Sequence, residues 1–203
     1  MLSYMDEKAS SLWDKYCELF TWWLNSESKP IEEACKISNE FWGDTAMELS
    51  FIPNPLYSPF ATDFVRIGNK VIVIGHSCDV ESMLHEALHI EIAKHRDKTT
   101  AFINEHWHDD FAKISRMIEM GYINQKDINH ADDYKPAYVR VIEECLVRGI
   151  STVLAGGGIR RLSVHANEGF GSVPAIGLFF EKMRPTSNSL GEFMDYVFNR
   201  YAT

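Results

Sequence analysis

Residues 70 to 95 read KVIVIGHSCDVESMLHEALHIEIAKH, and this stretch decides the fold that we expect. Its first five residues, Lys70 to Ile74, are typical of a strand, because the last four of them form a short, apolar, β-branched run. From Asp79 onward the apolar residues recur at helical spacing. The stretch therefore predicts a strand that is followed directly by a helix.

Outward from this stretch, the pattern predicts many helices around a small mixed or antiparallel sheet. Further strands are expected over 47–52 and 63–67, and Gly68-Asn69 would join the second of them to the strand at 70–74 in a tight hairpin. Helices are expected over 3–25, from Pro30 to just before Gly43, and over 79–95, 104–120, 133–154, 173–184 and 189–201. The segment 159–173 is expected to be a long loop.

These elements predict an α+β, mostly helical fold in a single domain over residues 1–203. The N-terminal helices and the sheet would occupy residues 1–78. The helix that begins near Asp79 and the helical half of the chain would occupy residues 79–203.

The composition narrows the classes of function. Lys and Arg total 20 against 29 Asp and Glu, which gives a net charge of -9 and an isoelectric point near 5.3. This charge repels nucleic-acid phosphates and anionic lipid headgroups, so we expect neither nucleic acid nor a membrane as a partner. An acidic N-terminal stretch and the lack of a long apolar run predict a cytoplasmic, non-membrane protein.

The four cysteines are scattered and form no CxxC pair. This spacing predicts reduced, buried thiols, with two disulfides as the alternative.

The helix after Asp79 contains His85-Glu86-Ala87-Leu88-His89, an HExxH motif. Four residues advance a helix by about 400°, so both histidines project from nearly the same face and reach one tetrahedral ion. Glu86 lies beside the pair, where it can take a proton from a metal-activated water. The surrounding helix is mostly apolar, and burying these polar groups without a bound ligand is costly. The motif therefore predicts a metal site.

With this motif the chain resembles the zincin metallopeptidases, over roughly 75 residues. The resemblance implies Zn²⁺ as the cofactor, His85 and His89 as two of its ligands, and Glu86 as the general base. We also expect the strand before the motif helix to be an edge strand that receives an extended peptide by strand addition.

The third zinc ligand is expected on the helix over 133–154, which resembles the ligand helix of gluzincins. Glu144 follows His89 by fifty-five residues, and Arg148 stands four residues further on, where an i,i+4 pair would orient the carboxylate. Helical arithmetic keeps Glu143 as an alternative, because it shares its face with apolar residues such as Val147. We take Glu144 as the leading candidate.

Two histidines offer other third ligands. His95 occupies the metzincin position six residues after His89, but Ile92 replaces the glycine that the turn requires. His108, or its neighbour His106, resembles the third histidine of SprT-like zincins, with Asp109 in place of the usual glycine. Cys145 is expected to be a buried thiol and not a ligand.

A peptidase also needs a donor for the oxyanion of its tetrahedral intermediate. Tyr134, Tyr138 and His165 are the candidates, and their spacing does not select among them.

The sequence therefore predicts a zinc metallopeptidase, a hydrolase that cleaves peptide or protein substrates by metal-activated water with Glu86 as the general base. The acidic net charge favours basic peptides. The alternative is a non-catalytic, zinc-stabilised regulatory or interaction domain. A structural zinc site is closed by four protein ligands, whereas a catalytic one keeps an open position.

Overall fold

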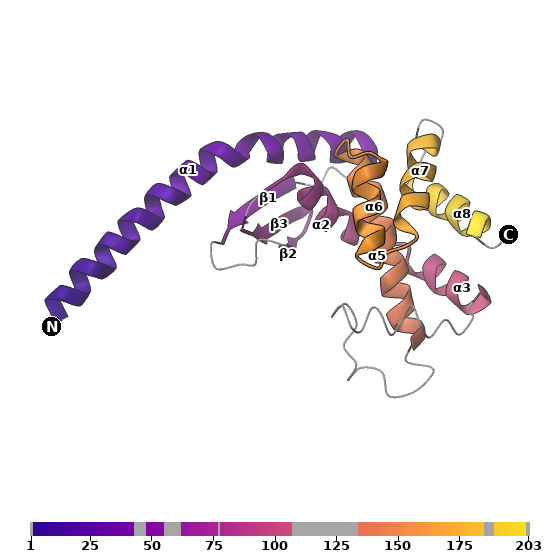
Figure 1. Cartoon of the computed structure of the whole chain (residues 1–203), viewed down its shortest axis with the longest axis horizontal. Coiled ribbons are helices and arrows are strands. Elements are labelled where there is room, and N and C mark those ends of the chain that lie inside the picture. Colours follow the sequence, from indigo (N-terminus) through magenta and orange to yellow (C-terminus); the bar gives the residue numbers. More distant parts are fainter. Residues whose placement is uncertain are drawn as a thin grey trace. The chain divides into compact units, whose positions relative to one another are not determined.

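The computed structural model describes residues 2–42, 48–54, 62–76, 78–106, 134–184 and 189–201. The chain divides into two compact units, Met1–Glu86 and Ala87–Thr203. The predicted α+β class is confirmed, because the described residues are mostly helical and include a small mixed sheet (Figure 1). The boundary between the units falls inside the helix α2, Val80–Ala93.

The sheet of the first unit consists of β1 (Glu48–Pro53), β2 (Thr62–Ile67) and β3 (Lys70–Gly75), in the order β1-β3-β2. β1 is parallel to β3, and β2 is antiparallel to β3. The predicted turn at Gly68-Asn69 joins β2 to β3. Gly68 has a φ of 64°, a conformation that glycine adopts without strain.

The expectation that the strand before α2 lies at the sheet edge is wrong, because β3 is the central strand. Val71 and Val73 are fully buried. The position of β3 in the chain, directly before α2, does not decide its place in the sheet, which depends on how the strands pair. The edges of the sheet are β1 and β2.

The two N-terminal helices that the sequence predicts are one helix, α1, which spans Leu2–Trp42 with Pro30 inside it. Proline removes one helical hydrogen bond and bends a helix, but flanking turns can carry the helix through it. Figure 1 shows α1 as a curved rod, without a break.

The helix α2 begins as the sequence predicts, next to Asp79. The carboxylate of Asp79 accepts hydrogen bonds from the backbone N–H of Ser82 (2.8 Å) and from its hydroxyl (2.9 Å), which caps the first turn. The helix ends at Ala93, and α3 (Arg96–His106) follows after a short turn. The sequence did not predict a helix over Arg96–His106, because polar residues open α3 and hide its apolar spacing. Of the helix predicted over 104–120, residues 104–106 form the end of α3 and residues 107–120 lie outside the described residues.

The second unit is built around α5 (Tyr134–Leu154), which packs against α7 (Val173–Met183) and α3. Gly149 permits the close approach of α5 to α7, because a Cβ there would lie 2.8 Å from the side chain of Ile176. The helix α8 (Leu190–Tyr201) completes this part of the chain. The largest fully buried side chains of the unit form its core: Leu88, Ile92, Leu146, Ile150, Leu162, Phe170, Ile176, Phe180, Phe193 and Met194.

The expected loop over 159–173 is wrong in its first half, where α6 spans Ile159–Asn167. Only Leu162 and His165 of this helix are buried, so the apolar pattern is too short to predict it. Before it, α5 ends in a Schellman motif: Gly157 N–H donates to Thr152 O (2.7 Å) and Gly156 N–H to Val153 O (3.0 Å). The run Gly156-Gly157-Gly158 thus ends α5.

Two remaining expectations concern membranes and thiols. None of the helices in the described part of the chain is long and apolar enough to cross a membrane. All four cysteines are described, and they form no disulfide with one another. Cys78 and Cys145 are buried, whereas Cys17 is exposed, contrary to the expectation that all four are buried.

Candidate metal centre

The structure brings His85, His89 and Glu144 together. Each offers one ligand atom, and these atoms all lie within 4.8 Å of one another. The helix α2 itself sets the one-turn spacing of the two histidines, and α5 supplies Glu144. These are the two motif histidines and the leading candidate for the third ligand.

The three groups could hold a metal ion. Ligand atoms of one tetrahedral zinc lie about 3.3 Å apart, because each bond to nitrogen or oxygen is about 2.0–2.1 Å long. The Nε2 atom of His89 lies 3.3 Å from Oε2 of Glu144. Two imidazoles and one carboxylate suit zinc and neighbouring transition metals better than Mg²⁺ or Ca²⁺, which prefer oxygen ligands throughout.

The orientation of Glu144 depends on Arg148, one helical turn further along α5. The Nε atom of Arg148 donates to Oε1 of Glu144 at 2.6 Å, while the other carboxylate oxygen faces His89. The predicted i,i+4 pair is therefore confirmed. Because the side chains of Glu144 and Arg148 are only 19% and 15% exposed, water screens this pair less than a surface pair.

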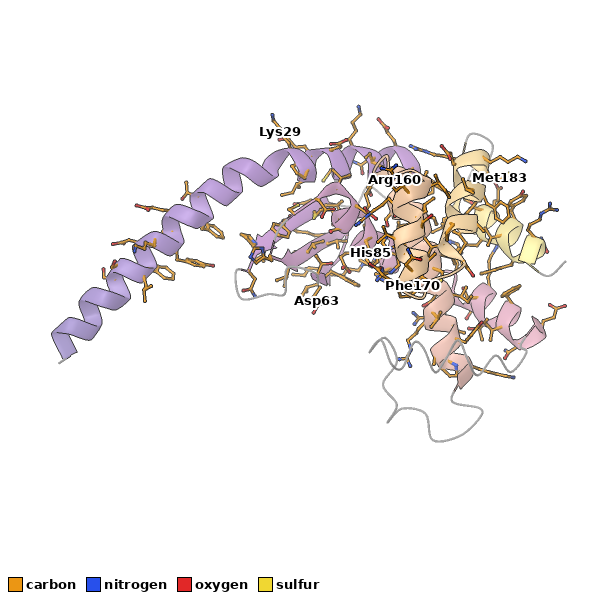
Figure 2. The ribbon with its side chains drawn as sticks, viewed as in Figure 1. Lys29, Asp63, His85, Arg160, Phe170 and Met183 are labelled. Carbon is orange, nitrogen blue, oxygen red and sulfur yellow. The ribbon has the colours of Figure 1, made fainter. Side chains whose placement is uncertain are left out.

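Three further groups fix Arg148. Its Nη1 atom donates to Oε2 of Glu168 at 2.8 Å and lies 3.0 Å from Nδ1 of His165. Its guanidinium lies over the ring of Phe170, 4.1 Å from the centroid (Figure 2 labels Phe170). An arginine held on several sides presents a fixed hydrogen bond to Glu144.

His165 belongs to this support. It is 7% exposed, and its Nε2 atom lies 3.2 Å from the hydroxyl of Thr152. Its Nδ1 atom lies 3.2 Å from Oε2 of Glu168 in addition to its contact with Arg148. With protein groups at both ring nitrogens, His165 fits the positioning of Arg148 better than the predicted alternative of an oxyanion donor.

The neighbouring Glu143, an alternative third ligand, lies outside the cluster. Both of its carboxylate oxygens accept hydrogen bonds from Arg96, from Nε at 2.9 Å and from Nη2 at 2.7 Å. This hydrogen bond raises the pKa of Arg96 against the opposing effect of burial. Glu143 is 5% exposed, as its apolar helix face predicts, but Arg96 occupies its carboxylate.

The other proposed ligands and donors are placed as follows. His95 lies in the turn after α2, with its ring against Gly191, where a Cβ would be 3.1 Å from Cε1. His108 lies outside the described residues, as do the side chains of His106 and Tyr134. Tyr138 is half-buried on α5. Cys145 is buried, and burial raises the pKa of its thiol to about 12, so it is not a metal-binding thiolate.

The motif glutamate, Glu86, is 5% exposed. The hydroxyl of Thr62, the first residue of the edge strand β2, donates to its Oε1 atom at 2.5 Å. This bond fixes the orientation of the carboxylate within the first unit. The sequence offered no signal for Thr62, because the contact joins residues that are far apart in the chain.

A pocket of about 320 Å³ adjoins the cluster within the second unit. Two of the three cluster residues, His89 and Glu144, contribute to its wall. The residues that line it are His89, Arg96, Arg140, Val141, Glu143, Glu144 and Phe170. Neither Arg140 nor Phe170 was predicted as part of the site. Arg140 stands four residues before Glu144 on α5, whereas nothing in the spacing of Phe170 relates it to the motif.

No protein family, curated protein or solved structure matches this chain. The resemblance to zincins therefore rests on the HExxH motif, and an account of function depends on the geometry of the cluster.

Proposed function

We propose that the protein is a zinc-dependent peptidase whose metal is held by His85, His89 and Glu144. The observation that carries the proposal is the convergence of the two motif histidines with a carboxylate fifty-five residues later, all with ligand atoms within 4.8 Å. Three protein ligands leave a fourth position for water or substrate, as in catalytic zinc sites.

A bound zinc ion would polarise the scissile carbonyl and would lower the pKa of a coordinated water to about 7. The residues of this chain do the rest. Glu86 takes the proton of the attacking water and delivers it to the departing amine. Thr62 holds Oε1 of Glu86, which restricts the carboxylate to one orientation.

Arg148 has a separate task at the other carboxylate. By donating to Oε1 of Glu144, it fixes the second oxygen toward His89. His165, Glu168 and Phe170 hold Arg148 in this position. Such supporting contacts are typical of sites in which the metal geometry matters for chemistry.

Metal content tests the first half of the proposal. We expect elemental analysis to find one zinc per chain in the wild type, and none in His85→Ala or His89→Ala. His95→Ala is the matched control, because this histidine lies outside the cluster, and it should keep the metal. A protein that takes up no zinc would contradict the proposal.

Peptide cleavage tests the second half. Glu86→Gln should keep its zinc and lose at least about a hundredfold in the rate at which it cleaves a mixture of quenched fluorescent peptides. If the zinc-loaded wild type cleaves no peptide, the peptidase is refuted. A non-catalytic, zinc-stabilised domain would then remain, and zinc should raise its melting temperature.

A further inference from the structure

The pocket beside the cluster has walls of two kinds. Val141 and the ring of Phe170 supply apolar surface, and two arginines and two glutamates supply charge. Its volume of about 320 Å³ lies at the small end of the range for ligand pockets, which suits one side chain or one short terminal group. Because His89 and Glu144 line it, a group bound here lies next to the proposed metal.

Most of the charges in this wall are already balanced. Arg96 makes two hydrogen bonds to Glu143, so neither residue offers a net charge to a ligand. Glu144 is bonded to Arg148 and faces His89. With these pairs accounted for, Arg140 is the remaining cation of the pocket.

Arg140 is exposed, and among the residues that the structure describes no carboxylate pairs with it. It stands one turn before Glu144 on α5, just as Arg148 stands one turn after it. Glu144 pairs with Arg148, whereas Arg140 lines the pocket. A guanidinium beside apolar walls binds a carboxylate with two parallel hydrogen bonds.

We propose that this pocket binds a carboxylate of the substrate next to the scissile bond. The proposal rests on the proposed peptidase function and names its substrate class, peptides with an acidic group at a fixed position. The carboxylate belongs either to an Asp or Glu side chain or to the C-terminus of the peptide. This local preference is opposite to the one that the acidic net charge predicts.

Binding of two matched probes tests the pocket without catalysis. Succinic acid monohydroxamate carries a zinc-binding group at one end and a carboxylate at the other, and the second probe has an amide in place of that carboxylate. In calorimetric titrations of the zinc-loaded protein, we expect the acid to bind about tenfold more tightly than the amide. The ratio should fall to about one in Arg140→Gln and should stay near ten in the control Arg160→Gln, an exposed arginine outside the pocket.

The outcomes separate the two proposals. Equal affinity for both probes in the wild type would overturn the carboxylate pocket and leave the metal site standing. Binding of neither probe would show that the bound zinc has no open position for a ligand, so that the proposed peptidase and the pocket inference that rests on it would both fall.

Cleavage of a peptide mixture then distinguishes the sources of the carboxylate. We expect cleaved peptides to carry Asp or Glu at one fixed position, and Arg140→Glu to change that preference to Lys or Arg. If the carboxylate is instead the peptide's C-terminus, amidation of that end should lower cleavage about tenfold. Cleavage that responds to neither change would overturn the inference.

Discussion

Two adjacent glutamates on α5 have opposite surroundings. Both oxygens of Glu143 are bonded to Arg96, whereas one oxygen of Glu144 is bonded to Arg148 and the other faces His89. The two side chains project about 100° apart on the helix, which is enough to change their partners completely. An arginine that binds both oxygens occupies a carboxylate, and one that binds a single oxygen orients the carboxylate for another ligand.

Replacing each glutamate by glutamine breaks this comparison most directly. Glu144→Gln should weaken zinc binding by at least about a hundredfold, because it removes a charged ligand. Glu143→Gln should leave zinc affinity within about threefold of the wild type. Competition with a fluorescent zinc chelator measures both, and equal losses in the two variants would contradict the assignment of Glu144.

Arg148 tests whether orientation of Glu144 matters beyond its charge. Arg148→Lys keeps the positive charge but loses the planar fork that bonds Glu144 and Glu168 together. We expect zinc affinity to fall about tenfold to a hundredfold, the range found for supporting contacts of metal ligands. The exposed Arg160→Lys serves as the control, and an unchanged affinity in Arg148→Lys would assign Arg148 a structural role only.

The partner of Glu143 gives a smaller effect of a different kind. Glu143→Gln should lower the free energy of unfolding by about 1–2 kcal/mol, because it weakens a charge-assisted pair with a buried carboxylate. The Arg96 side chain is 56% exposed, so water can hydrate its guanidinium when the glutamate is replaced. This hydration limits the loss in the free energy of unfolding. Urea denaturation measures it, and a loss in zinc content without a loss in stability would contradict the comparison.

The thiol next to Glu144 gives the smallest effect. Burial and the Glu144 charge raise the pKa of Cys145 to about 12, so iodoacetamide at pH 8 should label exposed Cys17 and leave Cys145 unlabelled. The pKa of the Cys145 thiol is higher in the folded chain than in the unfolded chain. At a pH where the unfolded thiol ionises and the folded thiol does not, ionisation therefore favours the unfolded state. The contribution of Cys145 to stability should therefore be complete below about pH 9 and decline from there toward pH 12. Labelling of Cys145 at the rate of Cys17 would contradict its burial.

Local spacing predicted much of the site. Helix geometry places His85 and His89 on one face, because they are four residues apart. Arg148 stands four residues after Glu144, and this spacing indicated that Glu144, and not Glu143, is the glutamate oriented by this arginine. The apolar face of Glu143 correctly predicted its burial. It could not predict Arg96 as its partner, since that contact depends on how α3 packs against α5.

The errors have physical causes of the same kind. Pro30 would end a helix on local propensity, yet α1 continues through it. The centre of a sheet is decided by strand order, which the sequence of β3 alone does not contain. Thr62 bonds to Glu86 and Phe170 lies against Arg148, in each case between residues that are distant in the chain. No pattern in the sequence predicts such contacts.

The most direct test of the central claim is anomalous diffraction at the zinc absorption edge from crystals of the zinc-loaded protein. We predict one anomalous peak that is bonded to a nitrogen of His85, a nitrogen of His89 and an oxygen of Glu144, each about 2.0–2.2 Å away. Glu143 should remain paired with Arg96 in the same crystal. A peak held by other residues, or no peak near this cluster, would contradict the account.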